Sequence, residues 1–125
     1  MVYAIDIINA VDEIRPNSID IDQKAAWLTR CDGMIWEHVI RTHEGGKHMH
    51  PFQGFDEGDA QFGLLMIPEP HRAIYEYYLM AQIDLTNGDT ARYDNDMILY
   101  NDAVSKFARE WHREHMPRAQ PGMIF

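Results

Sequence analysis

Residues 90–115, TARYDNDMILYNDAVSKFAREWHREH, carry the clearest folding signal in this chain. Their large apolar side chains recur at alternating steps of four and three residues: Tyr93, Met97, Tyr100, Val104, Phe107 and Trp111. This spacing places the six side chains on one face of an α-helix, because residues three and four apart lie on the same side of it. We therefore predict a long helix from about Thr90 to His115 that packs along a partner helix through this face.

Upstream of this stretch, the same kind of spacing predicts three more helices, at about Tyr3–Ile14, Asp22–Thr42 and His71–Asn87. The first helix should end at Pro16, because proline disfavours helical backbone in the residue before it. Ser18 and Asp20 are the best candidates to cap the start of the second helix, since their side-chain oxygens can accept backbone N–H groups there.

The predicted third helix is apolar on almost every side, so it should be covered on more than one side by other helices or by a neighbouring subunit. Asn87 and Gly88 follow it, and glycine suits the left-handed conformation that often ends a helix. Asp89 can cap the fourth helix directly. The two helices should therefore form a tight hairpin.

The helical pattern fails between the second and third helices, where glycine, proline and acidic residues accumulate. We predict a mostly α, single-domain protein over residues 1–125, organised like a four-helix bundle. A long irregular loop at about 43–67 should separate the second and third helices, and an extended C-terminal tail should cover about 116–125. Loops of this length in compact domains are usually functional or disordered.

The composition narrows the class of protein. The 125 residues include 11 basic and 20 acidic side chains, a net charge of −9, and a single cysteine. The negative charge argues against non-specific nucleic-acid binding, which depends on Lys and Arg at phosphates. One cysteine excludes a disulfide framework and fits a reducing compartment. The first ten residues lack the basic start of a signal peptide, and no apolar run is long enough for a membrane span, so we expect a soluble, cytoplasmic protein.

Three histidines lie close together in the predicted loop, at His43, His48 and His50. Imidazoles at this density could bind zinc or nickel. Two glycines interrupt the segment, however, and the spacing is not that of a metalloprotease helix, so an exposed polar loop is the favoured interpretation. The Cys31 thiol is expected to fill space in the core. We find no catalytic signature and predict neither an enzyme nor a cofactor or metal.

Several short motifs together give the chain a family resemblance: Asp32–Glu37, Ile67–Pro70, Tyr78–Asp84, Asn87–Asp89 with Arg92–Tyr93, and His115–Pro117. They resemble those of head–tail connector adaptor (head completion) proteins of tailed bacteriophages and prophages. The resemblance implies a structural virion protein, made in the bacterial host cytoplasm, that assembles as a homo-oligomeric ring, often a dodecamer. Its partners would be the phage portal protein and the next connector or tail protein. DNA would pass through the ring without specific binding, because an acidic channel wall does not hold phosphates.

The resemblance also implies which segments bind partners. The loop from His43 to Gly63 would help to form the ring or bind the next component, and Trp111–Phe125 would dock on the portal. The partner-binding candidates are Phe52, Phe55, Trp111, Met116, Pro117, Met123, Ile124 and Phe125. Two alternatives remain open. One is a small metal-binding protein or enzyme that uses the 43–50 loop, and the other is an acidic regulator that mimics DNA.

Overall fold

Four α-helices form the described part of the chain, which in this computed structural model comprises residues 2–40, 63 and 65–114. They are α1 (Ala4–Ile14), α2 (Ile21–Ile35), α3 (Ala73–Thr86) and α4 (Thr90–Glu114). A short π-helical turn, η1 (Trp36–Ile40), continues α2. The prediction of an all-α single domain with four helices is therefore confirmed. The second helix is shorter than the predicted Asp22–Thr42, because the α-helix ends at Ile35 and η1 follows it, and residues 41 and 42 lie outside the described ones.

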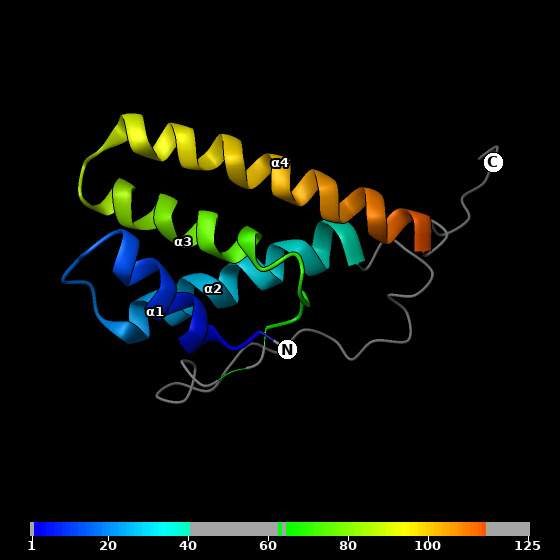
Figure 1. Cartoon of the computed structure of the whole chain (residues 1–125), viewed down its shortest axis with the longest axis horizontal. Coiled ribbons are helices and arrows are strands. Elements are labelled where there is room, and N and C mark those ends of the chain that lie inside the picture. The colour runs from blue at the N-terminus through cyan, green and yellow to red at the C-terminus, as the bar shows by residue number, and fades with distance from the viewer. Residues whose placement is uncertain (1, 41–62, 64, 115–125) are drawn as a thin grey trace.

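Helix α3 is the central element of the bundle. It runs antiparallel to α4 along most of its length, while α1 and α2 pack against its other side (Figure 1). Its buried side chains accordingly point in several directions, among them Ile74, Tyr78, Leu79 and Ile83. Helices of the same chain thus account for the apolar pattern around α3, and no neighbouring subunit is needed to explain it.

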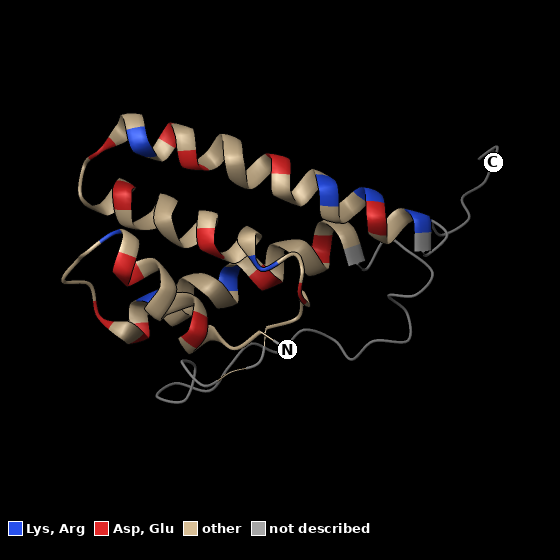
Figure 2. Cartoon of the chain, in the orientation of Figure 1, with Lys and Arg blue, Asp and Glu red and all other residues tan. Residues whose placement is uncertain are grey.

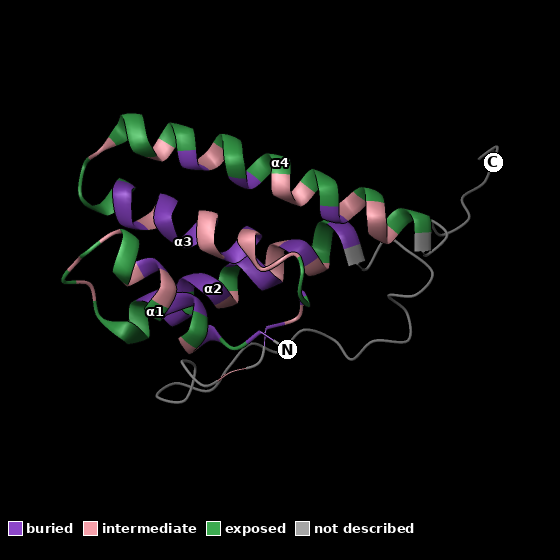
Figure 3. Cartoon of the chain, viewed as in Figure 1, coloured by how far each residue is buried: buried purple, intermediate pink, exposed green. Residues whose placement is uncertain are grey.

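The core lies where α1, α2 and α3 meet and continues into the contact between α3 and α4 (Figure 3). The predicted face of α4 contributes to it as expected. Tyr100 and Phe107 are buried, and Met97, Val104 and Trp111 are partly buried against the core. The side of α4 that faces away from α3 is largely exposed, so one long helix covers the core with one face and presents the other to the surroundings.

The turn between α3 and α4 is built as predicted. Gly88 has a φ of 78°, which is the left-handed region that glycine adopts without a steric cost. Asp89 Oδ1 accepts the Arg92 backbone N–H at 3.1 Å and so caps α4. These two neighbouring residues reverse the direction of the chain within a few positions and so place α3 and α4 side by side.

The start of α2 differs from the prediction. Asp20 occupies the N-cap position, but its side chain makes no capping hydrogen bond, and Ser18 lies outside the helix. Asn17 organises this connection instead. Its Oδ1 atom accepts the Ile19 backbone N–H at 3.1 Å, and its Nδ2 group donates to Arg15 O at 2.8 Å. The prediction that Ser18 or Asp20 caps α2 through its side chain is therefore wrong.

Helix α3 also starts later than predicted. α3 begins at Ala73, two residues after the predicted start, because the His71 backbone N–H closes a turn onto Pro68 O at 3.0 Å. Before this turn the chain pairs with its own N-terminal residues. Leu65 N donates to Val2 O at 2.8 Å, and Ala4 N donates to Gly63 O at 2.9 Å.

Candidate functional site

Asp32 lies inside the core, although it is acidic. It is 1% exposed and sits on the buried face of α2 between Leu28 and Ile35. Its Oδ1 atom accepts a 2.5 Å hydrogen bond from the Tyr75 hydroxyl group, and its Oδ2 atom accepts the Met66 backbone N–H at 3.0 Å. Both carboxylate oxygens are therefore satisfied, as a buried polar group requires.

Burial raises the pKa of Asp32 to about 6, although the hydrogen bonds from Tyr75 and Met66 act in the opposite direction. The Tyr75 oxygen also accepts the Ile67 backbone N–H at 2.7 Å. The neighbouring thiol of Cys31 is buried, and burial raises its pKa far above the ordinary value. These groups fix the 65–67 segment against α2 and α3, and the thiol fills space in the core as predicted.

A second polar cluster joins three helices at the end of the bundle that holds the α3–α4 turn. Arg15, which follows α1, donates from Nε to Asp84 Oδ1 and Oδ2, each at 3.3 Å, and from Nη2 to Asp96 Oδ1 at 3.4 Å. Asp84 belongs to α3 and Asp96 to α4, and both are buried. One guanidinium group therefore faces two carboxyl groups that have little access to water.

The surroundings of Asp96 in this cluster raise the pKa of its carboxyl group. Burial, together with a hydrogen bond to Asp84 and charge repulsion from it, raises the pKa of Asp96 to about 7, although Arg15 and Arg92 act to lower it. Asp96 Oδ2 has no hydrogen-bond donor among the described residues. A proton on Asp96 can be shared with Asp84, which leaves a single carboxylate to balance Arg15. The cluster thus joins the end of α1 to α3 and α4 through one guanidinium and two carboxyl groups.

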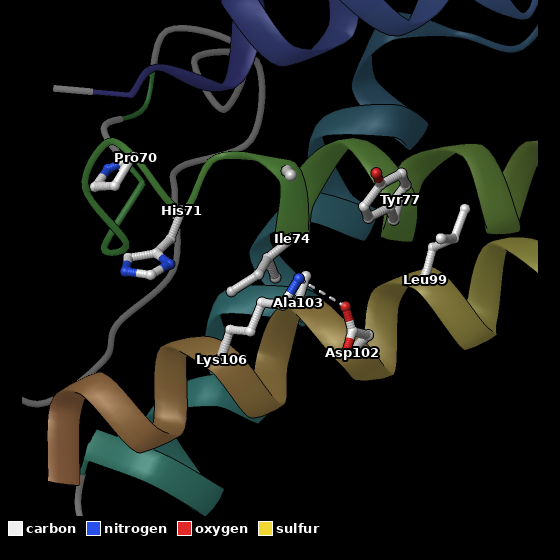
Figure 4. A pocket seen from close by; sticks show the side chains of 9 residues that line it. Pro70, His71, Ile74, Tyr77, Leu99, Asp102, Ala103 and Lys106 are labelled. Carbon is white, nitrogen blue, oxygen red and sulfur yellow. Dashed lines mark ion pairs between the residues drawn. The ribbon is translucent and has the colours of Figure 1, made fainter.

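The described surface also has a groove between the N-terminal half of α3 and the middle of α4 (Figure 4). Its volume is about 370 Å³. Ile74, Tyr77, Leu99 and Ala103 supply apolar walls, and the ion pair between Lys106 and Asp102 lies along one side at 3.0 Å. His71 Nε2, at one end of the groove, donates to Glu110 Oε2 at 2.6 Å and ties the start of α3 to α4.

Of the predicted partner-binding residues, Trp111 is the one that the structure describes. It is partly buried, and its indole ring lies 6.0 Å from the Phe107 ring, centroid to centroid. The other seven lie outside the described residues: Phe52, Phe55, Met116, Pro117, Met123, Ile124 and Phe125. His43, His48 and His50 lie outside them as well. The predicted loop and tail sites therefore stay predictions.

Within residues 2–40, 63 and 65–114, no group of three or more His, Cys, Asp or Glu side chains is arranged to hold a metal ion. The helices of this same part of the chain are too short or too polar to cross a membrane. Comparisons with protein-family models, with curated proteins and with solved structures gave no match to this chain.

Sequence reasoning missed the two buried polar clusters and the groove. The signal for Asp32 was present, because an acidic residue interrupts the apolar line of α2 at a position that must face the core. Arg15 likewise continues the apolar line of α1 beyond Val11. Nothing in the sequence showed that Arg15 meets Asp84, which lies 69 positions away. Ile98 and Leu99 fall outside the α4 stripe and were not singled out.

Proposed function

We propose that this chain is a structural, non-catalytic assembly subunit: a head–tail connector adaptor that forms a ring between the portal and the tail of a phage particle. The sequence motifs support the identity of the assembly. The main structural support is the end of α4, because it gives the proposed docking segment a fixed starting point. The segment begins at Trp111, inside the helix, and continues through residues 115–125.

Two contacts hold this end of α4 to the domain. The first is with the core, in which Phe107 is buried and against which Trp111, one turn later, is partly buried. One residue before Trp111, Glu110 accepts the hydrogen bond from His71 at the start of α3. The helix that precedes residues 115–125 in the sequence therefore has its last turns anchored to the domain, which is a suitable arrangement for presenting a short segment to a partner.

The buried ionisable side chains favour a structural role over catalysis. Lys24 on α2 donates to Asp12 on α1 at 2.8 Å, Asp32 joins α2 to α3 and the 65–67 segment, and Arg15 joins three helices. In the part of the chain that the structure describes, each buried charged side chain thus ties one element to another. Such groups hold a subunit in one shape rather than act on a substrate.

The acidic balance fits the proposed channel. Acidic residues occur in all four helices, whereas the basic residues Lys106, Arg109 and Arg113 lie in the C-terminal half of α4 (Figure 2). An acidic wall would let DNA slide past, because phosphates are repelled from it. The basic end of α4 lies next to the proposed docking segment, where it could meet an acidic surface of the portal protein.

The test is co-expression with the portal and neighbouring connector proteins, followed by electron microscopy of what co-purifies. We expect rings or ring-capped portals. Deleting residues 117–125 should leave the helical circular-dichroism spectrum and thermal unfolding unchanged but abolish incorporation. A deletion variant that unfolds would place the tail in the core, and one that is incorporated normally would remove the docking role.

A matched pair of tail variants makes the test sharper. Replacing Met123, Ile124 and Phe125 by serine should abolish incorporation, because it removes the apolar side chains available for docking. Replacing Arg118 and Gln120 by serine in the same tail should leave incorporation intact. Equal effects of the two sets would contradict docking by the apolar residues. Tightly bound metal that is lost in His48→Ala would support the metal-binding alternative.

A further inference from the structure

The outward face of α4 combines an exposed apolar side chain with a nearby groove. Ile98 is 67% exposed, more than any other large apolar side chain in the described residues. Leu99, the next residue, forms part of the wall of the α3–α4 groove with Tyr77 and Ala103 (Figure 4). Ile98 precedes Leu99 and is the more exposed of the two. A protruding side chain and a recess of suitable size therefore lie beside one another on the same helix.

Charges along this face are separated toward its two ends. Asp94 lies in the N-terminal half of α4, whereas Arg109 and Arg113 lie in the C-terminal half (Figure 2). All three side chains are exposed, and none of them forms an ion pair with another described residue. Lys106, in contrast, is held by Asp102. The face thus offers one acidic and one basic end that are free to pair with a partner.

We infer that a second copy of this chain binds this face, with the two α4 helices antiparallel and each Ile98 seated in the α3–α4 groove of the other copy. A two-fold axis reverses the direction of the partner helix, so the acidic end of one α4 meets the basic end of the other. A parallel pair would instead place like charges together. The same surface is therefore complementary to itself in the antiparallel orientation only.

The positions along the helix are consistent with this contact. If the two-fold axis crosses α4 near residue 101, Ile98 of one copy lies opposite residue 104 of the other, between the groove residues Ala103 and Lys106. Asp94 then lies opposite residue 108, about 10 Å from the axis at 1.5 Å per residue, where the long Arg109 side chain can reach it. The symmetry forms this Asp94–Arg109 pair twice.

This contact is separate from the contacts that would form the proposed ring. An isologous contact closes at two copies and cannot extend around a ring, so it describes the free subunit. Its test accordingly uses the purified full chain alone, without portal or tail proteins, and its outcome does not depend on the adaptor assignment. In the free subunit the contact would cover Ile98 and Leu99, the two exposed large apolar side chains of α4.

Analytical ultracentrifugation over a range of protein concentrations measures the association. We expect a monomer–dimer equilibrium for the natural sequence. Ile98→Asp should raise the dissociation constant at least about tenfold, because it places a charge in an apolar recess. Ile21→Asp is the matched control, since Ile21 is also exposed but begins α2, where an acidic residue is compatible with the helix dipole. It should leave the dissociation constant unchanged.

The charge pairs decide the orientation. Asp94→Arg and Arg109→Asp should each weaken the dimer severalfold, because each variant faces its own copy with like charges. An equimolar mixture of the two variants should regain the original affinity, since each copy then supplies the charge that the other lacks. Circular dichroism of each variant confirms that it is folded. A monomeric natural sequence, a dimer insensitive to Ile98→Asp, or a mixture no tighter than its components would overturn the inference.

Discussion

Tyr75 and Asp32 meet inside the core, where the Tyr75 hydroxyl group donates a 2.5 Å hydrogen bond to Asp32 Oδ1. The same hydroxyl oxygen accepts the Ile67 backbone N–H, and the other Asp32 oxygen accepts the Met66 backbone N–H. Two side chains from different helices thus accept the backbone N–H groups of Met66 and Ile67. These two consecutive residues lie outside the helices. Each member of the pair depends on the other, because an unpaired buried polar group is costly.

Removing the Tyr75 hydroxyl group should therefore destabilise the folded protein. We expect Tyr75→Phe to lower the free energy of unfolding by about 3 kcal/mol, because Asp32 Oδ1 and the Ile67 N–H both lose a buried partner. Urea unfolding followed by circular dichroism measures this change. Tyr77→Phe is the matched control on the same helix, since Tyr77 is partly exposed at the groove, and it should cost less than about 1 kcal/mol. Similar losses in the two variants would contradict the role given to Tyr75.

Asp96 should make stability depend on pH in a direction opposite to that of most carboxyl groups. Its pKa is raised to about 7 in the folded protein. Between about pH 4 and pH 7, the folded state therefore keeps a proton on Asp96 that the unfolded state has released. The stabilisation is complete below the unfolded-state pKa, near 4, and is lost as the pH rises through about 7.

Asp96→Asn isolates this effect, because asparagine keeps the hydrogen-bonding shape of the protonated acid and does not titrate. Between pH 4 and pH 8, the natural sequence should lose about 2 kcal/mol of unfolding free energy relative to Asp96→Asn. The figure allows for water near Arg15, which is 22% exposed on its side chain. Urea unfolding at several pH values measures the difference, and a difference that is constant with pH would contradict the raised pKa.

Arg15 should be essential to the same cluster. Arg15→Met leaves two buried carboxyl groups facing one another without the cation that is hydrogen-bonded to both, so we expect a loss of about 3 kcal/mol at pH 8. Adding Asp96→Asn should recover part of this loss, since it removes one of the two charges. Lys106→Met serves as the control, because it breaks an exposed ion pair worth less than about 1 kcal/mol. Thermal unfolding compares the natural sequence with Arg15→Met, Asp96→Asn, the double variant and Lys106→Met, and additive effects of Arg15→Met and Asp96→Asn would argue against coupling.

The helix caps give a further test. Asp89→Ala removes the side chain that accepts the Arg92 N–H at the start of α4, and it should cost about 1 kcal/mol. Ser18→Ala should change stability by less than about 0.5 kcal/mol, because Ser18 is exposed and does not cap α2. Chemical unfolding of both variants distinguishes the cap that forms from the one that the sequence pattern suggested.

The sequence predicted the helices well because their signals are local. The α4 stripe, Pro16 after α1 and the Gly88–Asp89 turn each act within a few residues of their own position. The start of α3 was placed two residues early, because the turn from Pro68 to His71 occupies positions where the apolar pattern already looks helical. Such turns depend on backbone geometry that side-chain periodicity does not report.

The polar clusters required knowledge of which helices meet. Arg15 and Asp84 are ordinary charged residues in the sequence and acquire their role only when α1 packs against α3 and the Arg15 side chain reaches α4. The groove has the same origin, since it exists only because α3 and α4 lie side by side. Trp111 was predicted as a partner-binding residue, and its position at the anchored end of α4 is compatible with that role. The role itself stays a prediction.

The pairing of residues 2–4 with 63–65 has a consequence for how the chain folds. The α3–α4 hairpin joins neighbours in sequence through a short turn, whereas the Leu65–Val2 hydrogen bond closes a loop of about 60 residues. Loop closure of that size carries an entropic cost before any contact compensates for it, so we expect the hairpin to form early and this junction late. Substitutions of core residues in the α3–α4 contact should then slow refolding, and substitutions at Val2 should chiefly speed unfolding.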